Sequence, residues 1–179
     1  MQSDEEIIKL IKEGNKDIFD LLIKKYKTGL YSYIFYSVKD ESTAEDIFQE
    51  TLLKVFTELK NYKESGKFKP WLYTIARNKI TDYFRASSKT APLLESDDDV
   101  LIPSKENVEK SVSSKISFEY ILKCLDNLAP QEKEIIILRQ YLSFKEIAET
   151  LNCPLGTALA RLNRAIKKLQ NILGDSYGL

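Results

Sequence analysis

The sequence has no histidine among its 179 residues, which excludes imidazole metal ligands and histidine-based acid–base catalysis. It has only two cysteines, Cys124 and Cys153, far apart and outside any CxxC spacing. Both lie among apolar neighbours, so we expect buried, reduced thiols. No Gly-rich phosphate loop or cluster of carboxylates at catalytic spacing is present either. We therefore predict no metal, no cofactor and no enzymatic activity.

Long apolar runs are also missing, since no stretch approaches the roughly twenty residues needed to span a bilayer. The first residues carry Asp4, Glu5 and Glu6, where a signal peptide would be basic and then apolar. We expect a cytoplasmic protein with no membrane insertion.

Net charge is absent too, because 27 basic residues balance 27 acidic ones. The charges are unevenly placed, however. Residues 67–89 carry six basic residues and one acid, whereas residues 90–115 carry three basic and six acidic residues. Such local asymmetry is more informative than the total, and 43% hydrophobic residues allow one large domain or two small ones.

The basic stretch from Lys67 to Lys89 shows two stripes at helical period. One is apolar and suits a core; the other is basic and aromatic and suits a nucleic-acid strand, since rings stack on bases and cations neutralise phosphates. The alternative is a surface helix whose charges are merely solvated. The stripes are Leu72, Ala76, Ile80 and Phe84 for the core, with Ile75 and Tyr83 beside them, and Tyr73, Arg77, Thr81 and Arg85 for the strand.

Helical periodicity also predicts helices over residues 4–13, 17–38 and 42–59 before this stretch. The run from Leu30 to Val38 is β-prone by composition, but we predict helix because the pattern on either side is helical. The third helix is predicted to begin at a capping box, Ser42-Thr43-Ala44-Glu45.

Composition changes between about residues 88 and 114, where Ser, Pro and a run of three Asp replace periodic apolar residues. We predict a flexible, acidic linker there, although a helix over part of it is an alternative. Helices are then predicted over residues 116–128, 130–141, 143–151 and 155–173. Pro130 suits the first position of the second of these helices, and Ser143-Phe144-Lys145-Glu146 is a capping box at the start of the third. The last two read as a helix-turn-helix, a basic second helix being the type that enters a major groove; a plain helical hairpin is the alternative.

Three motifs occur in order along the chain. Together they resemble the bacterial extracytoplasmic-function RNA polymerase sigma factors, over about four fifths of the sequence. The motifs are Ala44-Glu45-Asp46-Ile47-Phe48-Gln49-Glu50-Thr51-Leu52-Leu53, then Phe68-x-x-Trp71-Leu72-Tyr73-x-Ile75-Ala76-Arg77-Asn78-x-x-x-Asp82-x-x-Arg85, then Glu146-Ile147-Ala148-Glu149-x-Leu151-x-x-Pro154-x-Gly156-Thr157-x-x-x-Arg161-Leu162-x-Arg164-Ala165.

The resemblance implies an all-α fold of two small helical domains. Residues 1–87 would be a helical bundle that binds core polymerase and melts the promoter, residues 88–114 the linker, and residues 115–179 a helix-turn-helix domain. It also implies that Asp46, Gln49 and Glu50, here called the core-enzyme face, bind the clamp helices of the polymerase's largest subunit. The spacing is compatible, since three-and-four steps share one helix face. A solvated acidic face is the alternative.

The resemblance further implies that the first domain melts the minus-ten promoter element and holds its non-template strand. Basic residues would contact the backbone, Asn78 a base or sugar, and Phe68 or Trp71 could stack, although Trp71 is expected to support the core. These residues form the minus-ten set: Lys67, Phe68, Lys69, Trp71, Tyr73, Arg77, Asn78, Lys79 and Arg85.

The second domain would read the minus-thirty-five element as duplex, but Ala158-Leu159-Ala160 and Ile166 depart from the family's polar pattern and cannot donate to bases. We hypothesise that part of an apolar stripe there is covered by the first domain, a regulator or a second copy; a wider core is the alternative. The stripe is Leu155, Leu159, Leu162, Ile166, Leu169 and Leu173. The minus-thirty-five set is Thr157, Arg161, Asn163, Arg164, Lys167 and Lys168.

The partners implied by the resemblance are the core enzyme, through its clamp helices and flap, promoter DNA, and an anti-sigma factor. Free, the chain should bind promoter DNA poorly. A stand-alone duplex-binding regulator is a second hypothesis, which leaves the basic aromatic stripe of residues 73–85 unexplained. A helical adaptor without DNA contact is a third; it would show no salt-dependent DNA binding.

Overall fold

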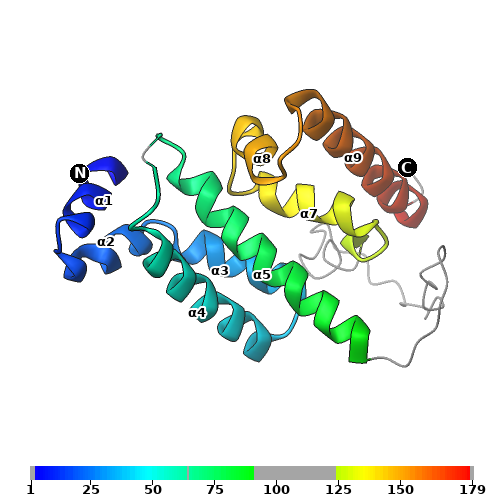
Figure 1. Ribbon diagram of the computed structural model, residues 1–179. Helices are drawn as coiled ribbons and strands as arrows, with labels where there is room; N and C mark the ends of the chain where they lie inside the picture. The colour runs from blue at the N-terminus through cyan, green and yellow to red at the C-terminus, as the bar shows by residue number, and fades with distance from the viewer. Residues whose placement is uncertain (1–2, 64, 91–123, 178–179) are drawn as a thin grey trace.

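The computed structural model describes residues 3–63, 65–90 and 124–177, and every regular element in these ranges is a helix. The prediction of an all-α fold is confirmed (Figure 1). The first helical unit contains α1 (Asp4–Lys12), the short 3₁₀ helix η1 (Lys16–Ile18), α2 (Phe19–Lys24), α3 (Lys27–Val38), α4 (Glu41–Glu58) and α5 (Phe68–Thr90). The second contains α7 (Pro130–Arg139), α8 (Phe144–Thr150) and α9 (Leu155–Tyr177).

Helices α3, α4 and α5 pack side by side and form the body of the first unit, with α1 and α2 at one end (Figure 1). Their shared core contains side chains with no exposed surface, such as Leu30 on α3, Val55 on α4 and Leu72 on α5. Burying a side chain of this size completely stabilises a fold by about 1.5–3 kcal/mol. This core fixes α4 and α5 against each other, so the residues on their outer faces occupy defined positions.

The helix predicted over residues 17–38 is broken at Lys25–Tyr26 into α2 and α3. The backbone at Tyr26 leaves ideal helix geometry, its N–H donates to Ile23, and its hydroxyl donates to Asp4 on α1. The Tyr26 ring also packs against Phe68 at a centroid distance of 5.7 Å. These contacts come from distant segments, so helical periodicity did not reveal the break. The β-prone run Leu30–Val38 is helical, as predicted.

Helix α4 does not begin at the predicted capping box. Its N-cap is Asp40, whose carboxylate accepts from the backbone N–H of Thr43 at 2.8 Å. Hydrogen bonds from the Thr43 side chain and backbone hold the pKa of Asp40 below its ordinary value. A carboxylate at the N-terminus of a helix also interacts favourably with the positive end of the helix dipole. Asp40 is therefore a good cap, and α4 starts before the predicted capping box.

Helix α5 continues to Thr90, but its buried face ends at Ile80. Phe84, predicted to lie on the core face, is 49% exposed, and its neighbour Tyr83 is 36% exposed. The periodic spacing continues past the point where neighbouring helices stop covering α5. The last turns therefore present two aromatic rings to solvent.

The second unit follows the predicted pattern closely. Pro130 is the first residue of α7, and Ser143 and Glu146 form the predicted capping box of α8 through reciprocal backbone bonds. Asn152 adopts a positive φ of 48° in the turn before α9, a conformation that Asn tolerates well. Helix α9 packs on α7 and α8. Most of the predicted linker and of the helix predicted over residues 116–128 lies outside the described residues.

The two units pack against each other, α5 along α8 and α3 along α7. Buried side chains of both units form one continuous cluster. The Tyr73 ring on α5 stacks on the ring of Tyr141, which lies between α7 and α8, at a centroid distance of 6.3 Å. The hydroxyl of Thr150 on α8 donates to the Pro70 carbonyl at 3.4 Å. Within the described ranges, no helix has the length and apolarity required to cross a membrane.

Candidate nucleic-acid interface

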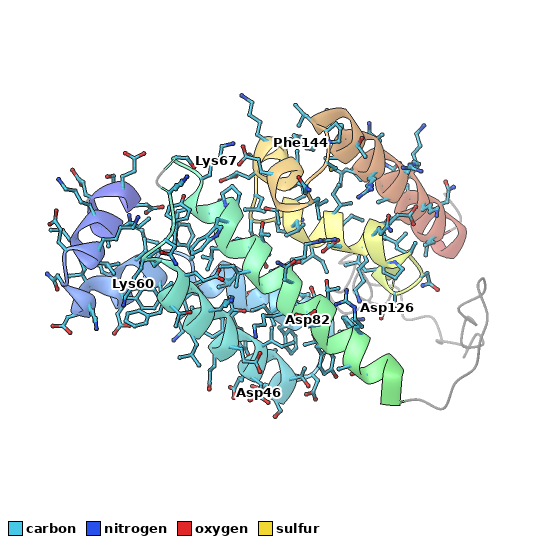
Figure 2. The ribbon with its side chains drawn as sticks, viewed as in Figure 1. Asp46, Lys60, Lys67, Asp82, Asp126 and Phe144 are labelled. Atoms are coloured by element: carbon cyan, nitrogen blue, oxygen red, sulfur yellow. The ribbon has the colours of Figure 1, made fainter. Side chains whose placement is uncertain are left out.

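The core-enzyme face lies on the outer side of α4, where Asp46, Gln49 and Glu50 are all exposed. Figure 2 shows Asp46 at the outer edge of the bundle, away from the second unit. Glu50 forms an ion pair with Lys79 on α5, with 2.8 Å between Oε2 and Nζ. Helix geometry thus presents three polar side chains together, and the docking of the two units leaves them open.

One further side chain on this side of α4, Leu53, was not among the residues predicted for the core-enzyme face. It lies seven residues after Asp46, two helical turns along the same side, and it is 67% exposed. A large apolar side chain in the middle of a polar, solvent-facing patch is typical of a protein–protein contact. Its spacing from Asp46 is the signal in the sequence that could have placed Leu53 on this face.

Three cations of the minus-ten set are paired with glutamates of the second unit. Lys67 contacts Glu149 at 2.8 Å, and Lys69 contacts Glu146 at 3.7 Å, both across the α5–α8 boundary. Figure 2 shows Lys67 at the end of α5 that faces α8. The third pair joins Arg77 on α5 to Glu134 on α7 at 2.8 Å.

The Arg77 Nε donates to Glu134 Oε1 at 2.8 Å, and its Nη2 donates to Oε2 at 3.5 Å. Glu134 also accepts from the hydroxyl of Tyr33 on α3 at 3.3 Å. Tyr33 is 1% exposed, and its burial, together with the Glu134 carboxylate, raises its pKa well above the ordinary value. One carboxylate of the second unit is therefore held by two helices of the first.

The remaining polar members of the minus-ten set have different positions. Lys79 is engaged by Glu50, Arg85 pairs with Asp82 at 3.0 Å, and Asn78 is exposed. These three lie away from the boundary with α8. The cations of the minus-ten set therefore form two groups, one paired with the second unit and one paired within the first unit.

The aromatic members are not placed for stacking. Phe68 is 2% exposed, and Tyr73 is 1% exposed. Burial, with Tyr141 and Glu146 nearby, raises the pKa of Tyr73. Trp71 is half-buried and packs on Tyr62 at 4.6 Å, in the supporting role expected for it. The exposed rings are instead Tyr83 and Phe84, 5.3 Å apart, which sequence analysis had assigned to the core side.

The minus-thirty-five set lies on α9. Thr157 and Arg161 are half-buried, whereas Asn163, Arg164, Lys167 and Lys168 are exposed. Lys168 pairs with Glu132 on α7 at 2.8 Å, and that hydrogen bond holds the pKa of Glu132 below its ordinary value. The helix thus brings most of the predicted cations to its solvent side.

The apolar stripe predicted along α9 is split. Leu162 is buried in the core of the second unit, in agreement with a wider core. Leu155, Leu159 and Ile166 are 41%, 36% and 39% exposed, although the two units are docked. The first unit therefore does not cover them. In the part of the chain that the structure describes, no group of Cys, Asp and Glu side chains is arranged to hold a metal ion.

Two family models match this chain, in the order of the two units. The model described as Sigma-70 region 2 matches residues 22–90, and that described as Sigma-70, region 4 matches residues 118–169. The chain is 31% identical over 178 residues to the ECF RNA polymerase sigma factor BldN of Streptomyces coelicolor. It spans 66% of that protein's length. It is also 26% identical to the ECF RNA polymerase sigma-E factor of Haemophilus influenzae, covering 94% of both chains.

Solved structures share the fold. CnrH, in a complex with the cytosolic domain of CnrY, superposes with a TM-score of 0.72 at 19% identity, over 97% of this chain and 99% of that one. The sigma factor RpoE of Bartonella quintana, in a complex with the anti-sigma factor NepR, gives 0.69 at 24% identity, over 87% and 96%. The fold of this chain is therefore shared by solved structures over most of its length.

Proposed function

The chain belongs to the extracytoplasmic-function RNA polymerase sigma factors, and from this premise we propose how its residues divide the work of initiation. The first unit recruits core polymerase and captures the minus-ten strand. The second reads the minus-thirty-five duplex. The chain acts by binding and not as an enzyme, and it works in the cytoplasm, where core polymerase is found.

Recruitment uses the core-enzyme face together with Leu53, on the clamp helices of the polymerase's largest subunit. The observation that carries this proposal is the openness of that face while the two units are docked. Interfaces of this kind depend on a few residues around an apolar centre. Asp46, Gln49 and Glu50 supply the polar rim, and Leu53 supplies the centre.

Strand capture uses the cations of the minus-ten set, with Asn78 for a base or sugar. The exposed Tyr83 and Phe84 are the rings available for stacking. Opening duplex costs about 1.4 kcal/mol per base step, and stacking one base on an aromatic ring returns about 1–3 kcal/mol. The two terms are close in size, so the chain needs the binding energy of the polymerase to hold a melted promoter.

Duplex reading uses α9, with Arg164, Lys167 and Asn163 reaching a major groove and the groove's edges. Apolar Leu159 and Ile166 cannot donate there, so this contact should be weak. The exposed apolar side chains on α9 suit an anti-sigma factor, which we propose as the regulator. The structurally similar RpoE was solved in a complex with the anti-sigma factor NepR, and CnrH in a complex with the cytosolic domain of CnrY.

Transcription with purified core polymerase on a promoter library tests this function. We expect transcripts from a restricted promoter class only when the chain is present. A gel shift should show tight promoter binding with core enzyme and weak binding without it. Tight, sequence-specific binding by the chain alone, or no transcripts from any promoter, would contradict the proposal.

A further inference from the structure

Oppositely charged side chains face each other at the boundary between the two units. Each of Lys67, Lys69 and Arg77 has a glutamate of the second unit as its partner. Lys67 directly precedes α5, Lys69 and Arg77 lie on it, and their partners come from α7 and α8. A negatively charged oxygen thus already lies beside each cation that strand capture would use.

Carboxylate and phosphate oxygens bind lysine and arginine in similar ways, and arginine binds either group through two parallel hydrogen bonds. Glu134 shows this two-point contact with Arg77. We propose that Glu134, Glu146 and Glu149 occupy the positions of phosphates of the captured strand. Docking of the second unit and binding of single-stranded DNA would then exclude each other. This inference rests on the proposed function and deepens it.

The pairs suit a contact that must be released. Lys67 and Glu149 are 57% and 37% exposed, and the other two pairs are partly exposed. Ion pairs of this kind are individually weak and are screened by salt. A strand that offers several phosphates along its backbone can therefore displace them together.

Other contacts hold the units together without charge. The Tyr141 ring covers Tyr73, and Thr150 donates to Pro70. Charge matching is thus separable from docking by mutation. Glutamine at the three glutamate positions removes the charges and keeps their size, and Glu146→Gln can still serve in the capping box of α8.

The test uses the full chain and measures anisotropy of a labelled random-sequence DNA strand of about 15 nucleotides, a length that single-strand binders cover. The variant is Glu134→Gln/Glu146→Gln/Glu149→Gln. At about 0.1 M salt we expect it to bind about tenfold more tightly than the unmodified chain, equivalent to about 1.4 kcal/mol. The matched control, Glu13→Gln/Asp17→Asn/Asp20→Asn, makes the same charge change at exposed positions of the first unit and should leave affinity close to that of the unmodified chain.

A second variant, Tyr141→Ser, loosens docking and keeps every charge. It should also bind the strand more tightly, and small-angle scattering should show a larger radius of gyration. The same increase should follow when the strand is added to the unmodified chain. Binding of the strand without that increase would overturn the proposal.

The remaining outcomes separate two failures. If Tyr141→Ser binds the strand more tightly but the glutamine variant matches the control, the cations are masked by bulk and not by carboxylates, and the inference is wrong. If neither variant binds the strand although scattering shows separated units, strand capture by α5 itself fails. Recruitment of core polymerase would then be tested independently, since it uses α4.

Discussion

Two neighbouring helices of the first unit present their functional residues very differently. The outer face of α4 is open, with Asp46 and Leu53 exposed. The cations at the edge of α5, here called the covered edge, face the second unit instead, and Lys67 and Arg77 are paired with its glutamates. The helices are packed together and joined by the Lys79–Glu50 pair, so the difference does not come from the first unit's own fold.

This difference gives an order of events for our proposed function. The open face can bind core polymerase while the units are docked, whereas the covered edge requires them to separate first. Binding to polymerase can supply the free energy for that separation, because a partner that binds the open arrangement better shifts the population toward it. The rings of Tyr83 and Phe84 are 36% and 49% exposed while the units are docked, so they are accessible before the units separate.

The largest effect should come from removing the open face. We expect Asp46→Ala/Gln49→Ala/Glu50→Ala to weaken binding to core polymerase at least about a hundredfold, the range of interface hot spots. The radius of gyration of the free chain should not change, since these residues lie outside the boundary between units. Biolayer interferometry with immobilised core enzyme measures the affinity. The control is Glu58→Ala, elsewhere on α4. Equal binding by both variants would show that the open face does not bind core polymerase.

Leu53→Asp tests the apolar part of the same open face. Placing a charge at the apolar centre of the contact should weaken binding to core polymerase about thirtyfold, or about 2 kcal/mol. Because Leu53 is 67% exposed in the free chain, the thermal unfolding temperature should stay nearly constant. Leu53→Met keeps apolar volume and should bind almost normally. Normal binding by Leu53→Asp would show that the contact lies elsewhere on α4.

Gly29→Ala should weaken the docking of the two units without changing any charged residue. A Cβ at Gly29 on α3 would lie 2.9 Å from the Tyr73 hydroxyl oxygen and 3.0 Å from a Tyr141 ring carbon. Overpacking of this kind costs about 1–3 kcal/mol, so the ratio of docked to separated chains should fall about tenfold. Energy transfer between dyes on the two units measures it. Gly156→Ala on α9 meets nothing within 4 Å and is the matched control. An unchanged ratio would mean that this junction does not hold the units together.

The smallest expected effect concerns Asp126, which contacts Lys39 of the first unit. Burial raises its pKa, but hydrogen bonds from Lys39 and Lys133 outweigh burial and hold the pKa below its ordinary value of 3.8. A lowered pKa means that this carboxylate stabilises docking at neutral pH and ceases to do so as the pH falls through the lowered value. Asp126→Asn should therefore reduce docking by at most a few-fold at pH 7, as is usual for exposed pairs.

The same energy-transfer measurement, repeated at falling pH, checks the sign. The difference between Asp126→Asn and the unmodified chain should narrow below pH 3.8, because the unmodified carboxyl then also becomes neutral. If the difference in docking between the two chains widened in acid, the ionised Asp126 carboxylate would not be the form that stabilises docking. Asp17→Asn, at an exposed position of the first unit, should match the unmodified chain throughout.

Much of the local structure was predictable because local chemistry decides it. The capping box at Ser143 and the helix start at Pro130 depend on residues within one helical turn, and both were predicted correctly. The start of α4 was predicted wrongly, because Asp40 and Ser42 are both good caps and the sequence does not rank them. The break at Tyr26 depends on Asp4 and Phe68, which are distant in sequence.

For the candidate site, helical spacing predicted which residues share a face better than it predicted how exposed each of them is. The exposed positions of Asp46, Gln49 and Glu50 follow from their spacing relative to the apolar side of α4. Burial of Phe68 and Tyr73 and exposure of Phe84 do not, because helical periodicity specifies a face but not how far along that face a neighbour extends.

The sequence by itself determined an all-helical chain with the motifs of two sigma-factor regions, because helical period, caps and motif spacing are local properties. Only the tertiary structure decided which functional residues are accessible. The pairing of Arg77 with Glu134, 57 residues away, joins groups that no local pattern connects. Each charge was visible in the sequence, but whether it faces solvent, DNA or another carboxylate depends on how the two units pack.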